Sequence, residues 1–149
     1  KRQITQFTYF QQMAGLQCSP VSVELTYGLE RICMFVQEKS NVFDILWNKD
    51  GTLYNDIYQK NEKQFSKYNF ELANIDYLFN NFESLEKEAK NLLLNKLPLP
   101  AYDYSLKASH VFNILDSRGA ISTAQRAGYI SRIRDLVKEV GLKWLEEKK

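Results

Sequence analysis

The sequence predicts an α+β fold that is mainly α, in which two antiparallel strands lead into a bundle of helices. Two patterns support this prediction. Residues 3–13 and 21–25 are rich in Thr, Val, Phe and Tyr and poor in helix formers, which is typical of strands. After Gly28, apolar residues recur at steps of three and four, the spacing of a buried helical face.

The junction between the second strand and the first helix is the most informative part of the chain. The turn between the strands is expected over residues 14–20, which contain a glycine and a proline. A helix is then expected over residues 28–38, with Glu30 and Arg31 in its first turn, beside the unpaired N–H groups of the helix start. Such a position, at the carboxyl end of a strand, suits a polyanion such as a nucleotide phosphate.

The later helices are separated by clear breaks. The first is expected over residues 54–70 and the third over residues 101–117. The second and the last are each expected from one buried face: Ile75, Leu78, Phe79, Phe82, Leu85, Ala89 and Leu92 in the second, and Tyr129, Ile133, Leu136, Val140 and Trp144 in the last. Pro98 and Pro100 are expected to lie between the second and third of these, because proline cannot continue a helix. Gly119 is expected to end the third, and Ser122 with Gln125 resembles a capping box that starts the last.

Composition excludes several classes of function. Two cysteines, Cys18 and Cys33, are too few for a disulfide scaffold or a zinc site, so a reducing cytoplasm is expected. His110 is the only histidine, which excludes Ser-His-Asp, Cys-His and multi-histidine metal sites within this chain. No apolar run approaches the roughly 20 residues that span a bilayer, and no signal peptide is visible, so no membrane association is expected.

Two segments carry a family resemblance. Residues 26–32, Thr-Tyr-Gly-Leu-Glu-Arg-Ile, resemble motif 3 of the class II aminoacyl-tRNA synthetases, in which Gly-apolar-Gly-apolar-Glu-Arg precedes an apolar run; Thr26 replaces the first glycine. Residues 5–12 and 24–31 together resemble the α subunit of bacterial heterotetrameric glycyl-tRNA synthetase. Residues 68–71, 98–102 and 112–122 match the same family, so the resemblance covers nearly the whole chain.

The resemblance implies a domain organisation. Residues 1–38 would be the last antiparallel strands of a class II catalytic sheet together with motif 3, and residues 39–149 a helical domain. Motifs 1 and 2 are expected upstream of Lys1, in a longer chain. Because the arginine of motif 2 would then be missing, residues 1–149 alone are expected to be catalytically inactive.

The resemblance also assigns the nucleotide site. It implies that Arg31 contacts the γ-phosphate of ATP and packs on the adenine, and that Gly28 and Glu30 belong to the same ATP-binding turn. A guanidinium suits this task because it keeps its charge and offers several donors in a planar fork. Mg²⁺ would arrive with the ATP, and the sequence identifies no ligands for it. The alternative is an Arg31 that pairs with a neighbouring carboxylate on a solvated turn.

A glycine pocket is expected on the strands. Side chains alternate along a strand, so Gln6, Thr8 and Phe10 share one face. The class II synthetase for alanine is a relative of this family. By analogy with that enzyme, Gln6 and Thr8 would orient the glycine, Phe10 would exclude larger side chains, and Glu24 would receive the glycine ammonium group. If the Glu24 carboxylate is buried, it needs a positively charged partner, because an unpaired buried charge is costly. The alternative is that the Glu24 side chain faces water.

The function implied is that of a glycine–tRNA ligase α subunit, which activates glycine with ATP to glycyl adenylate and transfers it to tRNA-Gly. The expected partners are the β subunit, a second α subunit in an α2β2 tetramer, and the tRNA. The net charge of +2 does not itself indicate nucleic acid. The last helix has a modest excess of basic side chains, which is compatible either with binding RNA or with an ordinary solvated face: Arg126, Arg132, Arg134, Lys138 and Lys143. The alternative function is a non-catalytic helical module that binds a protein or RNA.

Overall fold

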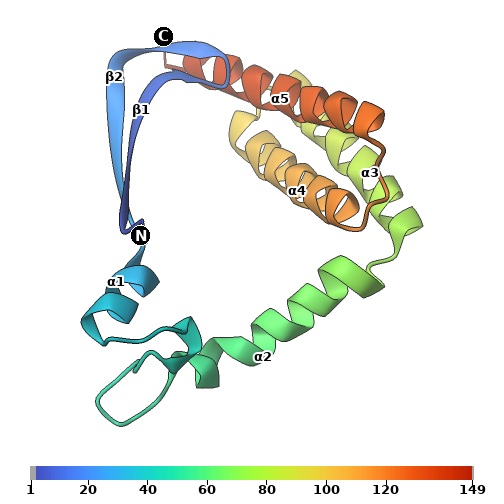
Figure 1. The fold of residues 1–149 in the computed structure, drawn as a ribbon. Coiled ribbons are helices and arrows are strands. Elements are labelled where there is room, and N and C mark those ends of the chain that lie inside the picture. Colours follow the sequence, from blue (N-terminus) through green and yellow to red (C-terminus); the bar gives the residue numbers. More distant parts are fainter. Residues whose placement is uncertain (1–2, 149) are drawn as a thin grey trace. The chain divides into compact units, whose positions relative to one another are not determined.

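The computed structural model describes residues 3–148 and confirms the predicted fold class, a two-stranded antiparallel sheet followed by helices. The elements follow one another along the chain as drawn in Figure 1: β1 (Thr5–Met13), β2 (Leu16–Tyr27), α1 (Leu29–Val36), the 3₁₀ helix η1 (Val42–Asp44), α2 (Tyr54–Lys67), the π-helix η2 (Tyr68–Leu72), α3 (Ile75–Leu94), α4 (Pro98–Ser117) and α5 (Thr123–Glu146). The helix expected over residues 54–70 therefore ends as α2 at Lys67 and continues as one π turn.

The chain divides into two compact units. The first comprises residues up to Met13 and Gln17–Lys67, and the second comprises Ala14–Leu16 with the residues from Tyr68 onward. The first unit contains most of both strands together with α1 and α2, and the second contains the three long helices. The boundary expected at residue 38 refers to the domains of the family and stays a prediction.

The turn of the β-hairpin is shorter than the sequence predicts. Ala14 and Gly15 both have left-handed backbone angles, with φ of 53° and 74°, which is the signature of a two-residue type I′ turn. β2 therefore begins at Leu16, and the expected turn over residues 14–20 is wrong beyond Gly15. Pro20 lies inside β2, where its missing N–H is tolerated because each strand of a two-stranded sheet has a free edge.

The two strands differ in length, and this changes their register. Near the turn, Gln12 Nε2 donates to Gln17 Oε1 at 3.4 Å, so these residues lie opposite each other. At the other end of the strands, the Gly28 N–H donates to the Ile4 carbonyl at 2.9 Å. If the register were constant along the hairpin, Leu25 and not Gly28 would lie opposite Ile4. β2 has twelve residues against nine in β1, so three extra residues are inserted in β2. Because side chains alternate, an odd insertion reverses the face on which the later β2 residues lie.

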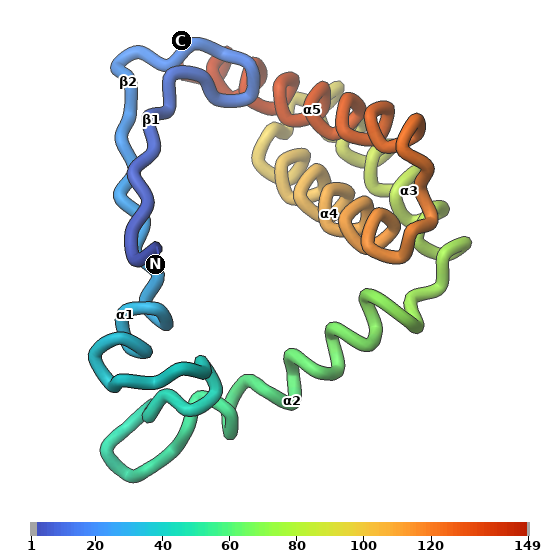
Figure 2. Tube along the Cα trace, viewed as in Figure 1, coloured from blue at the N-terminus to red at the C-terminus, as the bar shows by residue number. Residues whose placement is uncertain are grey.

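In the second unit α4 packs against both α3 and α5, and Figure 2 shows the three helices alongside one another. Their core contains most of the residues predicted from the helical spacing, among them Leu78 and Phe82 of α3 and Leu136 of α5. Trp144 is predicted on the same face of α5, but it is 40% exposed, because it lies near the end of the helix. α4 begins at Pro98, three residues before the predicted start, because a proline in the first turn needs no N–H partner. The capping box between Ser122 and Gln125 is confirmed.

A buried ion pair joins α3 to α5. Glu86 is 7% exposed, and both of its carboxylate oxygens accept hydrogen bonds from Arg132, at 3.1 and 2.6 Å. The same guanidinium donates to Glu83 at 2.7 Å and lies over the rings of Phe82 and Tyr129, 4.7 and 5.2 Å from their centroids. Hydrogen bonding to Arg132 holds the pKa of Glu86 below its ordinary value. Glu83 and Glu86 of α3 thus serve the pairing of α3 with α5.

Candidate functional site

The junction from β2 to α1 places Gly28, Glu30 and Arg31 together at the base of the hairpin. Gly28 is the N-cap of α1, and no side chain caps this helix start. Glu30 and Arg31 lie in the first turn of α1 and are exposed, as the sequence predicts. The free end of the helix and an exposed guanidinium therefore occur at one place, which favours an anionic ligand.

Arg31 is held by the backbone rather than by a carboxylate. Its Nη1 donates to the carbonyl of Gln3 at 2.8 Å, and none of the ion pairs formed among residues 3–148 involves it. A guanidinium has five N–H donors, so the one bond to Gln3 orients the side chain and leaves most of its donors for a ligand. The alternative in which Arg31 pairs with a neighbouring carboxylate is not what the structure shows.

Gly28 makes room for this arginine. Its φ of −82° and ψ of 93° are open to any residue, so the backbone does not require a glycine. A Cβ atom at residue 28 would instead lie 3.3 Å from Cδ and 3.6 Å from Cβ and Cγ of Arg31. The glycine of the motif therefore lets the arginine side chain lie against the turn.

Glu30 has an electrostatic neighbour that sequence reasoning missed. Its negative charge acts on the hydroxyl of Tyr54, the first residue of α2. Burial, and after it the negative charge of Glu30, raise the pKa of Tyr54 above its ordinary value. Nothing in the sequence near residue 54 signals this proximity, because it depends on how the segment between α1 and α2 folds back.

The strand residues expected to bind glycine share one face. Gln6 Nε2 donates to Thr8 Oγ1 at 3.5 Å, whereas the rings of Phe7 and Tyr9 lie 5.1 Å apart on the other face, so the predicted alternation is confirmed. Thr8 and Phe10 are half-buried and Gln6 is exposed. The face of β1 that carries Gln6 and Thr8 therefore also carries Phe10, as the sequence predicts.

Glu24 is exposed, and no ion pair formed within residues 3–148 includes it. The expected positive partner is therefore not a Lys or Arg of the part of the chain that the structure describes. An exposed carboxylate without a cationic neighbour of this kind suits a small cationic ligand such as an ammonium group.

The basic side chains of α5 are largely neutralised by neighbours. Arg126 pairs with Asp116 at 3.1 Å and Lys143 with Glu146 at 2.9 Å, while Arg132 is engaged by α3. Three of the five cations that could contact RNA are therefore already paired. This favours the interpretation of the helix surface as a mixed, solvated face.

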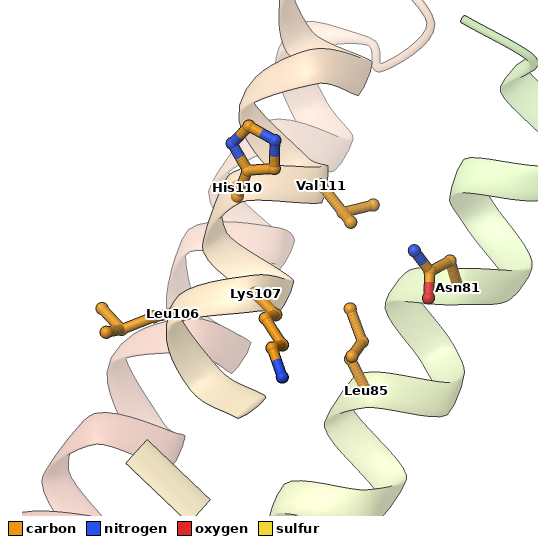
Figure 3. A pocket seen from close by; sticks show the side chains of 6 residues that line it. All are labelled: Asn81, Leu85, Leu106, Lys107, His110 and Val111. Atoms are coloured by element: carbon orange, nitrogen blue, oxygen red, sulfur yellow. The ribbon is translucent and has the colours of Figure 1, made fainter. Parts of the chain in front are cut away.

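A groove with a volume of about 470 Å³ lies between α3 and α4 in the helical unit. Figure 3 shows Asn81 and Leu85 on α3 and Val111 and Lys107 on α4 along its two sides. Lys107 is paired with Asp103 at 2.7 Å, and the lining is mostly apolar. Its titratable side chains are His110 and Lys107, and no carboxylate or cysteine is among the residues that line it.

Metal-binding clusters and membrane-spanning helices are both absent from the described residues. Among residues 3–148, no three His, Cys, Asp or Glu side chains come close enough to hold a metal ion. None of the helices in that range is both long and apolar enough to cross a membrane. The expectation that Mg²⁺ enters with ATP stays a prediction, because such an ion is bound mainly by the nucleotide.

A comparison of the sequence with protein-family models places the chain in a known class. The family model described as "Glycyl-tRNA synthetase alpha subunit" matches residues 2–149, almost the whole chain. The match places the chain among the aminoacyl-tRNA synthetases, the ligases that attach amino acids to tRNA. Within that class, the chain belongs to the glycyl-tRNA synthetase α subunit family. The resemblance inferred from residues 5–12 and 24–31 is confirmed, and an α subunit implies a β-subunit partner and a tRNA substrate.

Proposed function

We propose that this chain forms part of the catalytic site of a class II glycine–tRNA ligase, which activates glycine with ATP and transfers it to tRNA-Gly. It acts in the cytoplasm as part of an α2β2 assembly with a second α subunit and the β subunit. Family membership supports the reaction as a whole. The local geometry supports the assignment of particular steps to residues 3–31.

The observation that carries the proposal is the state of Arg31. Its side chain is exposed, oriented by the Gln3 carbonyl and unpaired with any carboxylate within residues 3–148. An arginine at a helix start that is neither buried nor neutralised is suited to bind phosphate oxygens. In the proposal, Arg31 binds the γ-phosphate of ATP, and Gly28 and Glu30 shape the turn around the nucleotide.

Glycine binds on the polar face of the hairpin. Glu24 receives the ammonium group, Gln6 and Thr8 orient the backbone of the amino acid, and Phe10 limits the space beside its α-carbon. Selectivity for glycine requires rejection of a methyl group, which attraction alone does poorly, since one methylene is worth roughly 1–3 kcal/mol of binding. The half-buried ring of Phe10 next to Thr8 supports this role.

The chemistry requires positioning more than covalent help. A carboxylate oxygen of glycine attacks the α-phosphorus of ATP in line, the bond to the bridging oxygen breaks, and pyrophosphate leaves with its electron pair. The Mg²⁺ carried by ATP and cationic side chains neutralise the charge that develops. The resulting glycyl adenylate then passes its glycyl group to the 3′ end of tRNA, and AMP is released.

Glycine-dependent ATP–pyrophosphate exchange by the full-length α subunit with its β subunit tests the proposal. Exchange is expected with glycine and not with alanine. Arg31→Ala is expected to lower kcat/KM for ATP by about 100-fold or more, because a charged phosphate contact is lost. Arg134→Ala is the matched control, since Arg134 is also an exposed arginine on a helix.

Two results would contradict the proposal. If the folded wild-type assembly shows no exchange with either amino acid, the chain is better explained as a non-catalytic helical module that binds protein or RNA. If exchange occurs but Arg31→Ala behaves like Arg134→Ala, the reaction stands and the assignment of the phosphate contact to Arg31 is wrong.

A further inference from the structure

Helix α5 contains two glycines, Gly128 and Gly141, and they have different surroundings. A glycine inside a helix costs stability relative to alanine, so each one calls for a reason. A Cβ atom at residue 128 would meet nothing within 4 Å. A Cβ atom at residue 141 would instead lie 3.3 Å from Cδ1 of Leu16 and 3.5 Å from Cβ of Ala14. Gly141 therefore leaves room for the turn of the β-hairpin.

This turn belongs to the same compact unit as α5. Residues 14–16 group with the long helices, whereas the strand residues on either side of them group with the first unit. Ala14 and Leu16 are half-buried, although Met13 and Gln17 next to them are exposed. The burial of the turn residues thus agrees with their contacts on α5.

The conformation of the turn suits a close approach to the helix. Ala14 has a φ of 53°, which is uncommon for a residue that has a Cβ atom, and it is the Ala14 methyl group that lies against Gly141. Lys138 lies three residues before Gly141 and therefore on the same side of α5. Its Cδ is 3.9 Å from the position that a Cβ atom of Gly15 would occupy. All three turn residues therefore lie along one face of α5.

The turn joins the two strands on which the candidate glycine pocket is placed. Thr8 and Phe10 lie in the half of β1 that leads into the turn, whereas Gly28 and Arg31 follow the far end of β2. A displacement of the turn is therefore expected to move the residues of the glycine pocket more than those of the nucleotide-binding turn.

We infer that Gly141 is a positioning residue for glycine binding: it leaves the space on α5 in which Ala14 and Leu16 dock, and this contact fixes the end of the hairpin that leads to the glycine pocket. The inference rests on the proposed function, because the glycine pocket is part of that proposal. Gly141 acts through the turn residues and does not itself touch the amino acid. Its contribution is geometric, since binding depends on how accurately the pocket residues are held.

Amide hydrogen exchange of the full-length α subunit with its β subunit tests the docking of the turn. Gly141→Leu fills the space at residue 141, and we expect the amides of residues 14–17 to exchange about tenfold faster or more than in the wild type. Gly128→Leu is the matched control in the same helix, because its Cβ position is free of neighbours; we expect it to change exchange of the turn by less than about twofold. If the turn exchanges equally in Gly141→Leu and in the wild type, the inference is overturned.

Glycine-dependent ATP–pyrophosphate exchange tests the positioning role. We expect Gly141→Leu to raise KM for glycine about three- to tenfold, with kcat and KM for ATP changed by less than about twofold. General unfolding of α5 would instead reduce the amount of active enzyme and lower kcat. Leu16→Ala removes the other side of the contact and should also raise KM for glycine; because both changes break one contact, their effects should not add in the double variant. Additive effects, or equal KM values for glycine in Gly141→Leu and Gly128→Leu, would overturn the inference.

The outcome for the proposed function is distinguishable from the outcome for Gly141. Pyrophosphate exchange by the wild type that is lost in Arg31→Ala supports the proposed function whatever Gly141→Leu does. With that result in hand, faster hydrogen exchange of the turn together with an unchanged KM for glycine overturns only the positioning role. Absence of glycine-dependent pyrophosphate exchange in the folded wild-type assembly overturns both.

Discussion

The ion pair between Glu86 and Arg132 gives the sharpest test of what holds α3 to α5. We predict that Arg132→Met destabilises the folded chain by about 2 kcal/mol. Removing one partner of a fully buried pair costs about 3–5 kcal/mol, because the other charge is left buried and uncompensated. Two facts reduce this figure: the Arg132 side chain is 32% exposed, and Lys90 remains 3.1 Å from Glu86.

The measurement is urea and thermal unfolding of the 149-residue chain followed by circular dichroism. A loss of about 2 kcal/mol corresponds to a fall in Tm of roughly 4–8 °C for a chain of this size. Arg134→Met is the control on the same helix, and because Arg134 is exposed we expect it to change stability by less than about 0.5 kcal/mol.

The pH dependence provides a second criterion. The pKa of Glu86 in the folded chain is lowered, first by its hydrogen bond to Arg132, so its contribution to stability is present above the ordinary value of 4.5 and is lost as the pH falls through the lowered value. The difference in the free energy of unfolding between the wild type and Arg132→Met should therefore become smaller as the pH is lowered below about 4.5. Equal stability of Arg132→Met and Arg134→Met at neutral pH, or a difference that stays constant in acid, would refute this reasoning.

Three further predictions concern the core, a helix cap and the candidate site. Leu115→Ala should cost about 3–4 kcal/mol in urea unfolding, because this side chain is fully buried in α4, whereas Leu106→Ala on the half-exposed face of the same helix should cost less than about 1 kcal/mol. Ser122→Ala removes the capping box of α5 and should cost about 1 kcal/mol by the same assay; Ser122→Gly, which caps almost as well, should cost only a few tenths. Gly28→Ala should raise KM for ATP about three- to fivefold with an unchanged far-ultraviolet spectrum, because the added Cβ displaces Arg31; an unchanged KM would show that the side chain has room to adjust.

Local patterns predicted the helices well, and the reason is physical. Apolar spacing, capping residues and glycine act within a few positions, so Ser122 with Gln125 and the buried face of α3 are visible in the sequence. The errors occurred where one residue type permits two structures. Pro98 starts α4 instead of only breaking a helix, and Pro20 lies within β2 instead of ending a turn.

The candidate site was only partly predictable. Gly28, Glu30 and Arg31 are neighbours in the chain, so their common position follows from one turn. The segment between α1 and α2 folds back through bonds of Gln37 to Leu46 and of Tyr54 to Ile45, and no local pattern specifies these bonds. The role of Gly28 was also hidden, since a glycine suggests an unusual backbone angle and here it accommodates a side chain.

The hydrogen bond between Gly28 and Ile4 constrains how the hairpin can vary among relatives. Because it anchors the base of β2, a deletion or insertion of one residue between Glu24 and Gly28 would move the Glu24 side chain to the other face of the strand, even if every amino acid type were kept. Length changes in this short stretch therefore keep the face of the acidic residue only in steps of two, whereas changes closer to the turn leave it where it is. In aligning members of the family, gap parity between the acidic residue and the glycine is a better guide to an equivalent position than residue identity alone.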